Sequence, residues 1–160
     1  MSSKAEAALA VFQQIVGSEE GVGAWHTVDQ KQIDLFAEAT LDRQFIHIDP
    51  QKAAELSPYK VTIAHGFLTL SMVVHLGASI PPPRPEAYTG LVIGVNYGLD
   101  RVRFPSPVKV DSRIRARREL VAAELKNPTT LQTVQRVTVE IEGEEKPGCV
   151  AETLSRLIYS

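Results

Sequence analysis

The second half of the chain alternates between apolar and polar residues in four stretches, and the first half does not. The stretches cover residues 91–104, 112–124, 130–142 and 148–159, and Val, Ile and Thr dominate them. This composition and this two-residue period are typical of β-strands. Asn127-Pro128 and Glu142-Gly143 provide turns between stretches. The short connections leave no room for crossover helices, so the pattern predicts antiparallel neighbours.

The first half shows the wider spacing of helices. Apolar residues recur at helical intervals in 5–16 and in a segment from about 30 to 40, and Asp29 is a suitable N-cap for the second. Residues 24–28 resemble a short strand. Pro50 fits the first turn of a third helix, which would reach about residue 56 with Asp49 as its cap.

Residues 66–80 are apolar on almost every side, and Pro81-Pro82-Pro83 ends the run in an extended connection. Such a helix belongs at the centre of a fold, and Met72 and His75 are expected to lie in the core. The pattern predicts an α+β fold over residues 1–160 as one domain, with an antiparallel sheet of about five strands wrapped around a long central buried helix. One sheet covers only part of such a helix, so we expect a homodimer.

The composition excludes several classes of function. A net charge of −2 leaves no electrostatic footprint for nucleic acid. The basic cluster 113–118 is interrupted by Ile114 and Ala116, which indicates a strand with one solvated charged face. No run approaches the roughly 20 apolar residues of a membrane span. Cys149 is the single cysteine, so no intrachain disulfide is expected, and it is interpreted as a buried small residue in a cytoplasmic protein.

The candidate chemistry lies in residues 42–49, which show no periodicity and are predicted to form a loop. Asp42 and His47 are five residues apart, so neither a helix nor a strand brings them together, and the chain must bend between them. A carboxylate or neutral imidazole can take a proton from water. Gly66 opens the apolar run, where a backbone N–H at a helix start can stabilise a developing oxyanion.

Three groups of residues together resemble a known family. Residues 36–42 read Phe-Ala-Glu-Ala-Thr-Leu-Asp, 46–49 read Ile-His-Ile-Asp, and 64–66 read Ala-His-Gly, with Ser71 downstream. The run resembles the MaoC-like dehydratases, also called R-specific enoyl-CoA hydratases, of the hot-dog fold. Residues 96–108 are similar to the nodulation-protein-N-like branch. The family's Asn and Pro within the first motif are replaced by Gln44 and Phe45.

The resemblance implies that Asp42 and His47 hold and activate a water molecule, with the Gly66 amide as oxyanion-hole donor. The reaction would be hydration of a trans-2-enoyl thioester to the R-3-hydroxyacyl thioester, or the reverse dehydration. Coenzyme A or acyl carrier protein would deliver the acyl chain, and no metal or redox cofactor is implied. The expected substrate-binding residues are Gln44, Phe45, Ala64, Asn96 and Arg103.

The sequence is also compatible with other functions. Hot-dog thioesterases usually carry an acid in the central helix, and residues 66–80 contain none. A non-catalytic acyl-thioester-binding module or an inactive partner subunit is the second alternative, because Gln44 and Phe45 depart from the pattern. His47, Asp49 and His65 lack a fourth metal ligand at a convincing spacing. Asp49 is expected to cap a helix, and His65 to hydrogen-bond backbone.

Overall fold

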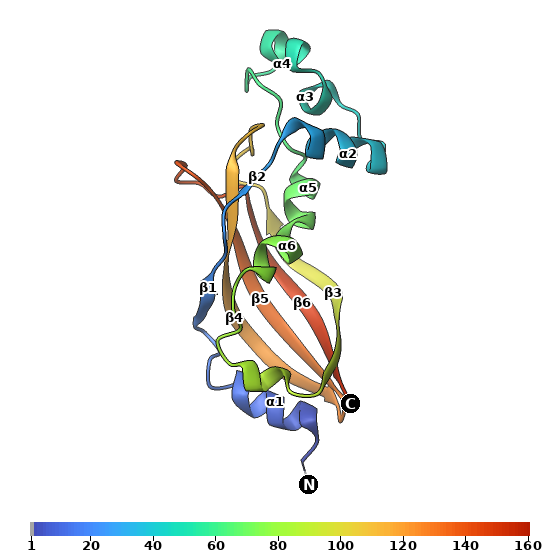
Figure 1. The fold of residues 1–160 in the computed structure, drawn as a ribbon, viewed down its shortest axis with the longest axis vertical. Coiled ribbons are helices and arrows are strands. Elements are labelled where there is room, and N and C mark those ends of the chain that lie inside the picture. The colour runs from blue at the N-terminus through green and yellow to red at the C-terminus, as the bar shows by residue number, and fades with distance from the viewer. Residues whose placement is uncertain (1) are drawn as a thin grey trace.

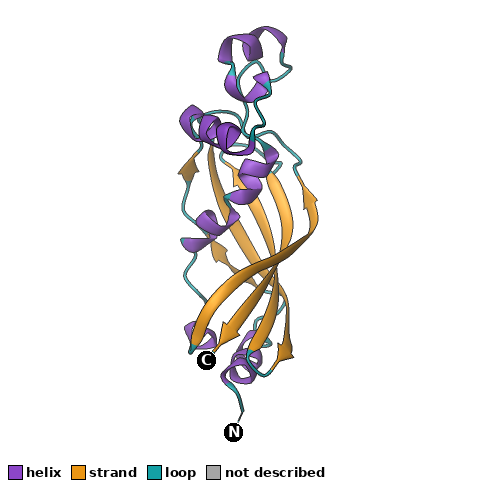
Figure 2. Cartoon of the chain, turned by 90° about the vertical axis from the view of Figure 1, so that its right-hand side faces the viewer, coloured by secondary structure: helices purple, strands orange, loops and turns teal. Residues whose placement is uncertain are grey.

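The computed structural model describes residues 2–160, and within them six antiparallel strands form one curved sheet around a pair of short helices (Figures 1 and 2). The strand order is β1-β4-β5-β6-β3, and β2 also pairs with β4. The long strands are β3 (Leu91–Arg103), β4 (Arg113–Asn127), β5 (Thr130–Ile141) and β6 (Cys149–Tyr159). The predicted α+β class and the four predicted strand stretches are confirmed, with ends shifted by at most three residues.

The sheet has six strands where about five were expected. The additional pairing comes from β1 (Glu19–Val22) and β2 (His26–Thr27), both of which lie against β4. The short strand expected at residues 24–28 is confirmed as β2, although it spans only two residues, whereas β1, with four residues, is too short to display a two-residue period in the sequence.

Local helix signals in the first half of the chain are confirmed. In α1 (Lys4–Phe12), Ser3 and Glu6 form a reciprocal capping box. Asp29 accepts from the backbone N–H of Gln32 at the start of α2 (Gln30–Thr40). Asp49 caps α4 (Pro50–Leu56) in the same way, and Pro50 occupies the first turn. These caps satisfy N–H groups that have no partner inside the helix.

The apolar run 66–80 forms two helices, α5 (Gly66–Ser71) and α6 (Val73–Ala78), in place of the single predicted helix. One face, including Leu68, Met72 and Leu76, packs on the concave side of the sheet. The other face is open in the single chain: Phe67 is 67% exposed and Val74 is 60% exposed. The prediction that His75 lies in the core is wrong, because His75 lies on the face that the sheet does not cover.

A separate group of helices projects beyond one end of the sheet, opposite the end where both termini lie (Figure 1). It consists of α2, the one-turn α3 (Phe45–Ile48) and α4. The predicted loop 42–49 is therefore only half correct, because its second half is helical. Likewise, the proline-rich connection contains the 3₁₀ turn η1 (Pro85–Tyr88) and is not extended throughout.

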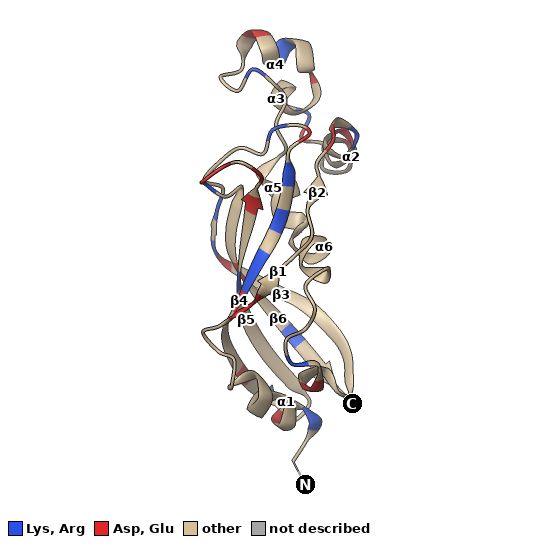
Figure 3. Ribbon diagram, turned by 60° about the vertical axis from the view of Figure 1, so that its left-hand side comes forward, with Lys and Arg blue, Asp and Glu red and all other residues tan. Residues whose placement is uncertain are grey.

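Basic residues follow one another along β4 (Figure 3), and Arg113, Arg115 and Arg117 alternate with buried residues, which places these three side chains on the outer face of the sheet. Arg115 and Arg117 both pair with Glu140 at 2.7 Å, and Arg113 pairs with Glu142. Ile114 and Ala116 point the other way and are fully buried. The solvated-face interpretation is confirmed for Arg113, Arg115 and Arg117 and is wrong for Arg118, whose side chain is only 17% exposed and faces inward. Among residues 2–160, no helix has the length and apolar character needed to cross a membrane.

Candidate functional site

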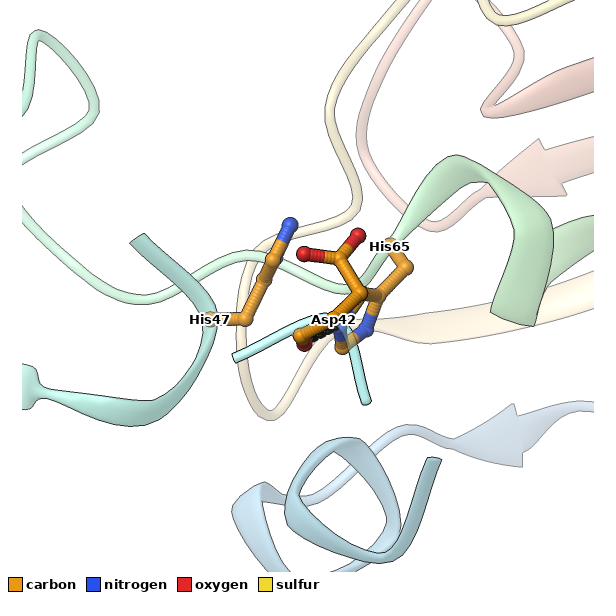
Figure 4. A group of neighbouring side chains, drawn as sticks. All are labelled: Asp42, His47 and His65. Atoms are coloured by element: carbon orange, nitrogen blue, oxygen red, sulfur yellow. Dashed lines mark hydrogen bonds between the residues drawn. The ribbon is translucent and has the colours of Figure 1, made fainter. Parts of the chain in front are cut away.

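Three titratable side chains meet where the helical projection joins the sheet. Asp42 follows α2, His47 lies in α3, and His65 directly precedes α5 (Figure 4). One nitrogen of each imidazole and one carboxylate oxygen lie within 4.8 Å of one another. Both imidazoles are buried and the aspartate is exposed. The structure therefore brings together the acid and the histidine singled out from the sequence.

The required bend is made by two local features. Leu41 adopts a left-handed conformation with φ of 64° and ends α2. The chain then runs without regular structure through Asp42 and Arg43, and Gln44 opens α3 in an extended conformation. This turn followed by a single helical turn places the side chains of Asp42 and His47 on the same side of the chain.

The imidazole of His47 is fixed in one tautomer. Its Nδ1 lies 2.7 Å from the carbonyl oxygen of Ile63. A carbonyl oxygen only accepts, so Nδ1 must carry the proton, and in the neutral ring Nε2 keeps its lone pair. Burial lowers the pKa of His47, against the raising effect of the hydrogen bond to Ile63, while the neighbouring His65 lowers it slightly and Asp42 raises it slightly. His47 is thus held as a neutral base.

His65 positions the other two groups. Its Nε2 donates to the backbone carbonyl of Asp42 at 2.9 Å. The prediction that His65 hydrogen-bonds backbone is therefore confirmed. Its ring stacks on His47 with centroids 3.7 Å apart and planes 23° apart, and Phe36 packs on it at 5.0 Å. With Nε2 protonated, the buried Nδ1 holds a lone pair, and this atom has no hydrogen-bond partner among residues 2–160.

Gln30 supports the site in a way that the sequence did not reveal. Its side-chain Nε2 donates to the backbone carbonyl of His47 at 2.7 Å and to Asp34 at 2.8 Å. Its Oε1 accepts from the hydroxyl of Thr62. Gln30 therefore joins α2, α3 and the segment before α5. A glutamine at the start of an amphipathic helix carries no signal of such a bridge, because its partners are 17 and 32 residues away.

Gly66 is the first residue of α5, so the helix offers its N–H no acceptor. A Cβ at this position would lie 2.9–3.1 Å from three ring atoms of Phe104, which explains why a glycine stands here. Gly66 and Ala64 line a cavity of about 310 Å³, together with Tyr59 and Phe104. The amide of Gly66 thus stands at the edge of a space that a ligand can enter.

The remaining predicted binding residues are dispersed. Asn96 lines two clefts between the sheet and α5–α6. Phe45 lies beneath the ammonium of Lys52 at 5.0 Å and lines neither the cavity at Gly66 nor the two clefts between the sheet and α5–α6. Gln44 is exposed at the start of α3. Arg103 is exposed at the end of β3 and donates to the carbonyl of Val102.

The geometry suits proton transfer better than metal binding. Asp42, His47 and His65 are close enough to offer one atom each to an ion. However, imidazole lone pairs lie in the ring plane, and two nearly parallel rings 3.7 Å apart cannot both aim a lone pair at one ion about 2 Å away. Asp49, the other candidate ligand, is engaged as the cap of α4. What remains is a carboxylate, a neutral imidazole and an unpaired backbone N–H.

Comparison with known proteins identifies the family. The profile of the MaoC like domain family matches residues 11–143. The chain belongs to the MaoC-like family. A curated relative, nodulation protein N of Rhizobium leguminosarum bv. viciae, is 47% identical over 150 residues, which cover 94% of this chain and 91% of the relative.

A second relative is 3-hydroxyacyl-thioester dehydratase Z of Mycobacterium tuberculosis, 44% identical over 144 residues, or 89% of this chain and 90% of that protein. Among solved structures, the R-hydratase PhaJ1 of Pseudomonas aeruginosa superposes with a TM-score of 0.67 at 23% identity, covering 91% of this chain and 83% of that one. This likeness confirms the hot-dog fold of the MaoC-like protein, and its curved sheet is not closed.

Proposed function

We propose that this MaoC-like protein adds water to trans-2-enoyl thioesters to give R-3-hydroxyacyl thioesters, or catalyses the reverse dehydration. One observation carries the proposal: a carboxylate and an imidazole fixed with Nε2 unprotonated lie within 4.8 Å of each other. The relatives named as a dehydratase and an R-hydratase support the same chemistry.

In the hydration direction, Asp42 accepts one hydrogen bond from a water molecule and Nε2 of His47 takes a proton from it. The water oxygen bonds to C3 of the enoyl group, and the π electrons move through C2 to the thioester oxygen. A proton then reaches C2 from the acid formed at His47, which restores the neutral imidazole. Positioned bases of this kind contribute roughly 10²–10⁴-fold to a rate.

The N–H of Gly66 stabilises the enolate in this scheme. Charge develops on the thioester oxygen as water adds, and a backbone donor aimed at that oxygen gains strength in the transition state. Losing such a donor costs about 3–4 kcal/mol. Because Gly66 has no side chain, the Phe104 ring packs directly against the backbone beside this amide and forms one wall of the cavity that Gly66 lines.

An apolar cleft lies beside the C-terminal end of α5, about one helical turn beyond Gly66, and would hold the acyl chain. Its volume is about 350 Å³, and it lies between α5–α6 and strands β3 and β6. The walls include Leu70, Val73, Val74, Leu99 and Leu154. Aliphatic side chains favour a hydrocarbon ligand, because burying each methylene contributes about 0.8 kcal/mol. Coenzyme A or acyl carrier protein would carry the thioester, and Arg103 stays a candidate contact for its phosphates.

A homodimer would complete the structure. Strand β3 is 13 residues long and lies at the edge of the sheet, paired only with β6 among the described strands. Several large apolar residues are exposed along it, including Val92, Ile93 and Tyr97, and Phe67 and Val74 are exposed on the helices nearby. An edge of this kind pairs readily with another strand. A second copy, related by a twofold axis, would cover both surfaces.

The test is the reaction of the purified full-length protein with crotonyl-CoA. Loss of the enoyl absorbance with formation of R-3-hydroxybutyryl-CoA supports the proposal. Release of free thiol without hydration would instead indicate a thioesterase. Tight binding of enoyl-CoA with neither reaction would indicate a non-catalytic acyl-thioester-binding module. This alternative is suggested by Gln44 and Phe45, which depart from the family pattern.

A further inference from the structure

A charged pair stands on the inner, core-facing side of the sheet. On β4, Arg118 lies between Ala116 and Leu120, both fully buried on the inner face. Its Nε donates to Oε2 of Glu20 at 3.0 Å, and the same oxygen accepts from Nε2 of Gln135 at 2.6 Å. The side chain of Glu20 is 0% exposed and that of Arg118 is 17% exposed. The strand pattern leads one to expect an apolar residue in place of Arg118.

Fold stability does not explain this pair. Replacing a buried ion pair by apolar residues of similar volume is often neutral or stabilising, because desolvation costs as much as the attraction returns. Arg118 also keeps hydrogen-bonding capacity to spare. A guanidinium has five N–H donors. Glu20 occupies Nε, and Nη1 makes only a long 3.4 Å contact with the carbonyl of Gly77.

The spare donors face a second cleft. This cleft has a volume of about 330 Å³ and lies between α6 and the inner face of the sheet. Its sheet side is mostly polar, and the residues that contribute are Asn96, Arg118, Gln135, Thr153 and Ser155. The charge of Arg118 is already matched by Glu20, so the cleft offers hydrogen-bond donors with little net charge.

The polar cleft continues the apolar one that would hold the acyl chain. The two clefts share Val73, Val74, Asn96 and Thr153. From Gly66 to Gly77, which touches Arg118, α5 and α6 together advance at most about 16 Å at the helical rise of 1.5 Å per residue. A long acyl chain with its thioester at Gly66 would therefore pass the apolar walls and place its distal end beside Arg118.

We propose that Arg118, with Gln135, selects acyl thioesters whose distal end carries a neutral oxygen acceptor, such as a hydroxyl group, over chains that end in a methyl group. This specificity rests on the proposed hydratase function. A methyl end would strip water from the donors without replacing its hydrogen bonds, which is costly, whereas an oxygen would accept them. Sites built to bind a hydroxyl discriminate strongly against analogues that lack it.

The experiment compares hydration of matched pairs of CoA thioesters: trans-2-octenoyl with 8-hydroxy-trans-2-octenoyl, and trans-2-decenoyl with 10-hydroxy-trans-2-decenoyl. For wild type, kcat/KM of the hydroxylated member should be at least tenfold higher at one of the two lengths. Arg118→Met should remove or reverse that preference while turnover of crotonyl-CoA stays within twofold of wild type. The matched control is Arg101→Met, an arginine whose side chain is 81% exposed on β3, and it should leave the preference intact.

Arg118→Met leaves the carboxylate of Glu20 buried without its cation, so the double variant Glu20→Gln/Arg118→Met provides a folded alternative. An equal or higher kcat/KM for the methyl-ended substrates in wild type would overturn the proposal. So would a preference that survives in the double variant. Failure of the hydratase function itself is recognised separately, because wild type would then leave crotonyl-CoA unchanged.

Discussion

His47 donates its Nδ1 proton to the carbonyl oxygen of Ile63, 2.7 Å away. This single hydrogen bond decides which nitrogen of His47 is free to act as a base. It also ties α3 to the segment that leads into α5, so the base and the oxyanion donor Gly66 are held on one framework.

The acid limb of the pH–rate profile should report His47. Burial lowers its pKa below the ordinary value of about 6.5. Because the neutral ring is the base, kcat/KM should fall on the acid side with a midpoint below pH 6.5. Steady-state hydration of crotonyl-CoA across this range is the measurement. A midpoint above 6.5 would contradict the assignment.

The same group should make stability depend on pH. The folded pKa of His47 is lowered, so between the folded and unfolded values the unfolded chain binds more protons and stability rises with pH. The stabilisation is fully present above about pH 6.5 and is lost as the pH falls toward the folded pKa. Urea unfolding at a series of pH values should show this loss in wild type, and His47→Gln should make it smaller. If the free energy of unfolding changes with pH in the same way in both proteins, His47 does not contribute to the pH dependence of stability.

Gly66→Ala should damage both packing and activity. The new methyl group would lie about 3 Å from the Phe104 ring, closer than carbon atoms tolerate. We expect a loss of about 1–3 kcal/mol in the free energy of unfolding, in line with overpacked cores, and a lower kcat. Gly98→Ala is the matched control, since a Cβ there meets nothing within 4 Å. Equal stability of the two variants would show that the contact with Phe104 is not limiting.

A charge on the edge strand should separate the proposed dimer. Ile93 is 52% exposed on β3, and Ile93→Lys would place an ammonium group in the interface. Light scattering at micromolar concentration should give a dimer for wild type and a monomer for this variant. Leu35→Lys, at a residue 62% exposed on α2, should remain dimeric. A monomeric wild type would contradict the dimer.

Cys149 should not react in the folded protein. Burial raises the pKa of its thiol to about 11, and the thiolate is the reactive form. At pH 8, a disulfide reagent should modify it only after the chain is unfolded by guanidinium. Rapid reaction under native conditions would show that β6 opens at its start or that Cys149 is accessible.

Signals that act over a few residues were readable from the sequence. Asp29 and Asp49 cap helices through backbone groups three residues away. The long strands are predicted by the alternation of apolar and polar residues. The convergence of Asp42 and His47 was predicted only as a bend. Its form depends on the left-handed Leu41, which no local preference favours in a branched apolar residue.

Features that depend on distant contacts were not readable. The break between α5 and α6 falls at Met72, whose sulfur accepts from the side chain of Gln32 across 40 positions of sequence. The stacking of His47 on His65 and the support from Gln30 likewise join segments that only the folded chain brings together. The spacing of residues along the chain therefore indicates Asp42 and His47 but not the contacts from His65 and Gln30 that position them.

The catalytic role of Asp42 and His47 is tested by measuring the hydration of crotonyl-CoA by wild type, Asp42→Asn and His47→Gln, with Asp49→Asn as control. Asp49 lies in the same segment but serves as the cap of α4, and asparagine caps a helix about as well as aspartate, so this variant should keep both its stability and its rate. The other two variants should fold normally and lose roughly 10²–10⁴-fold in kcat. If either of them hydrates crotonyl-CoA at the wild-type rate, Asp42 and His47 are not the catalytic pair.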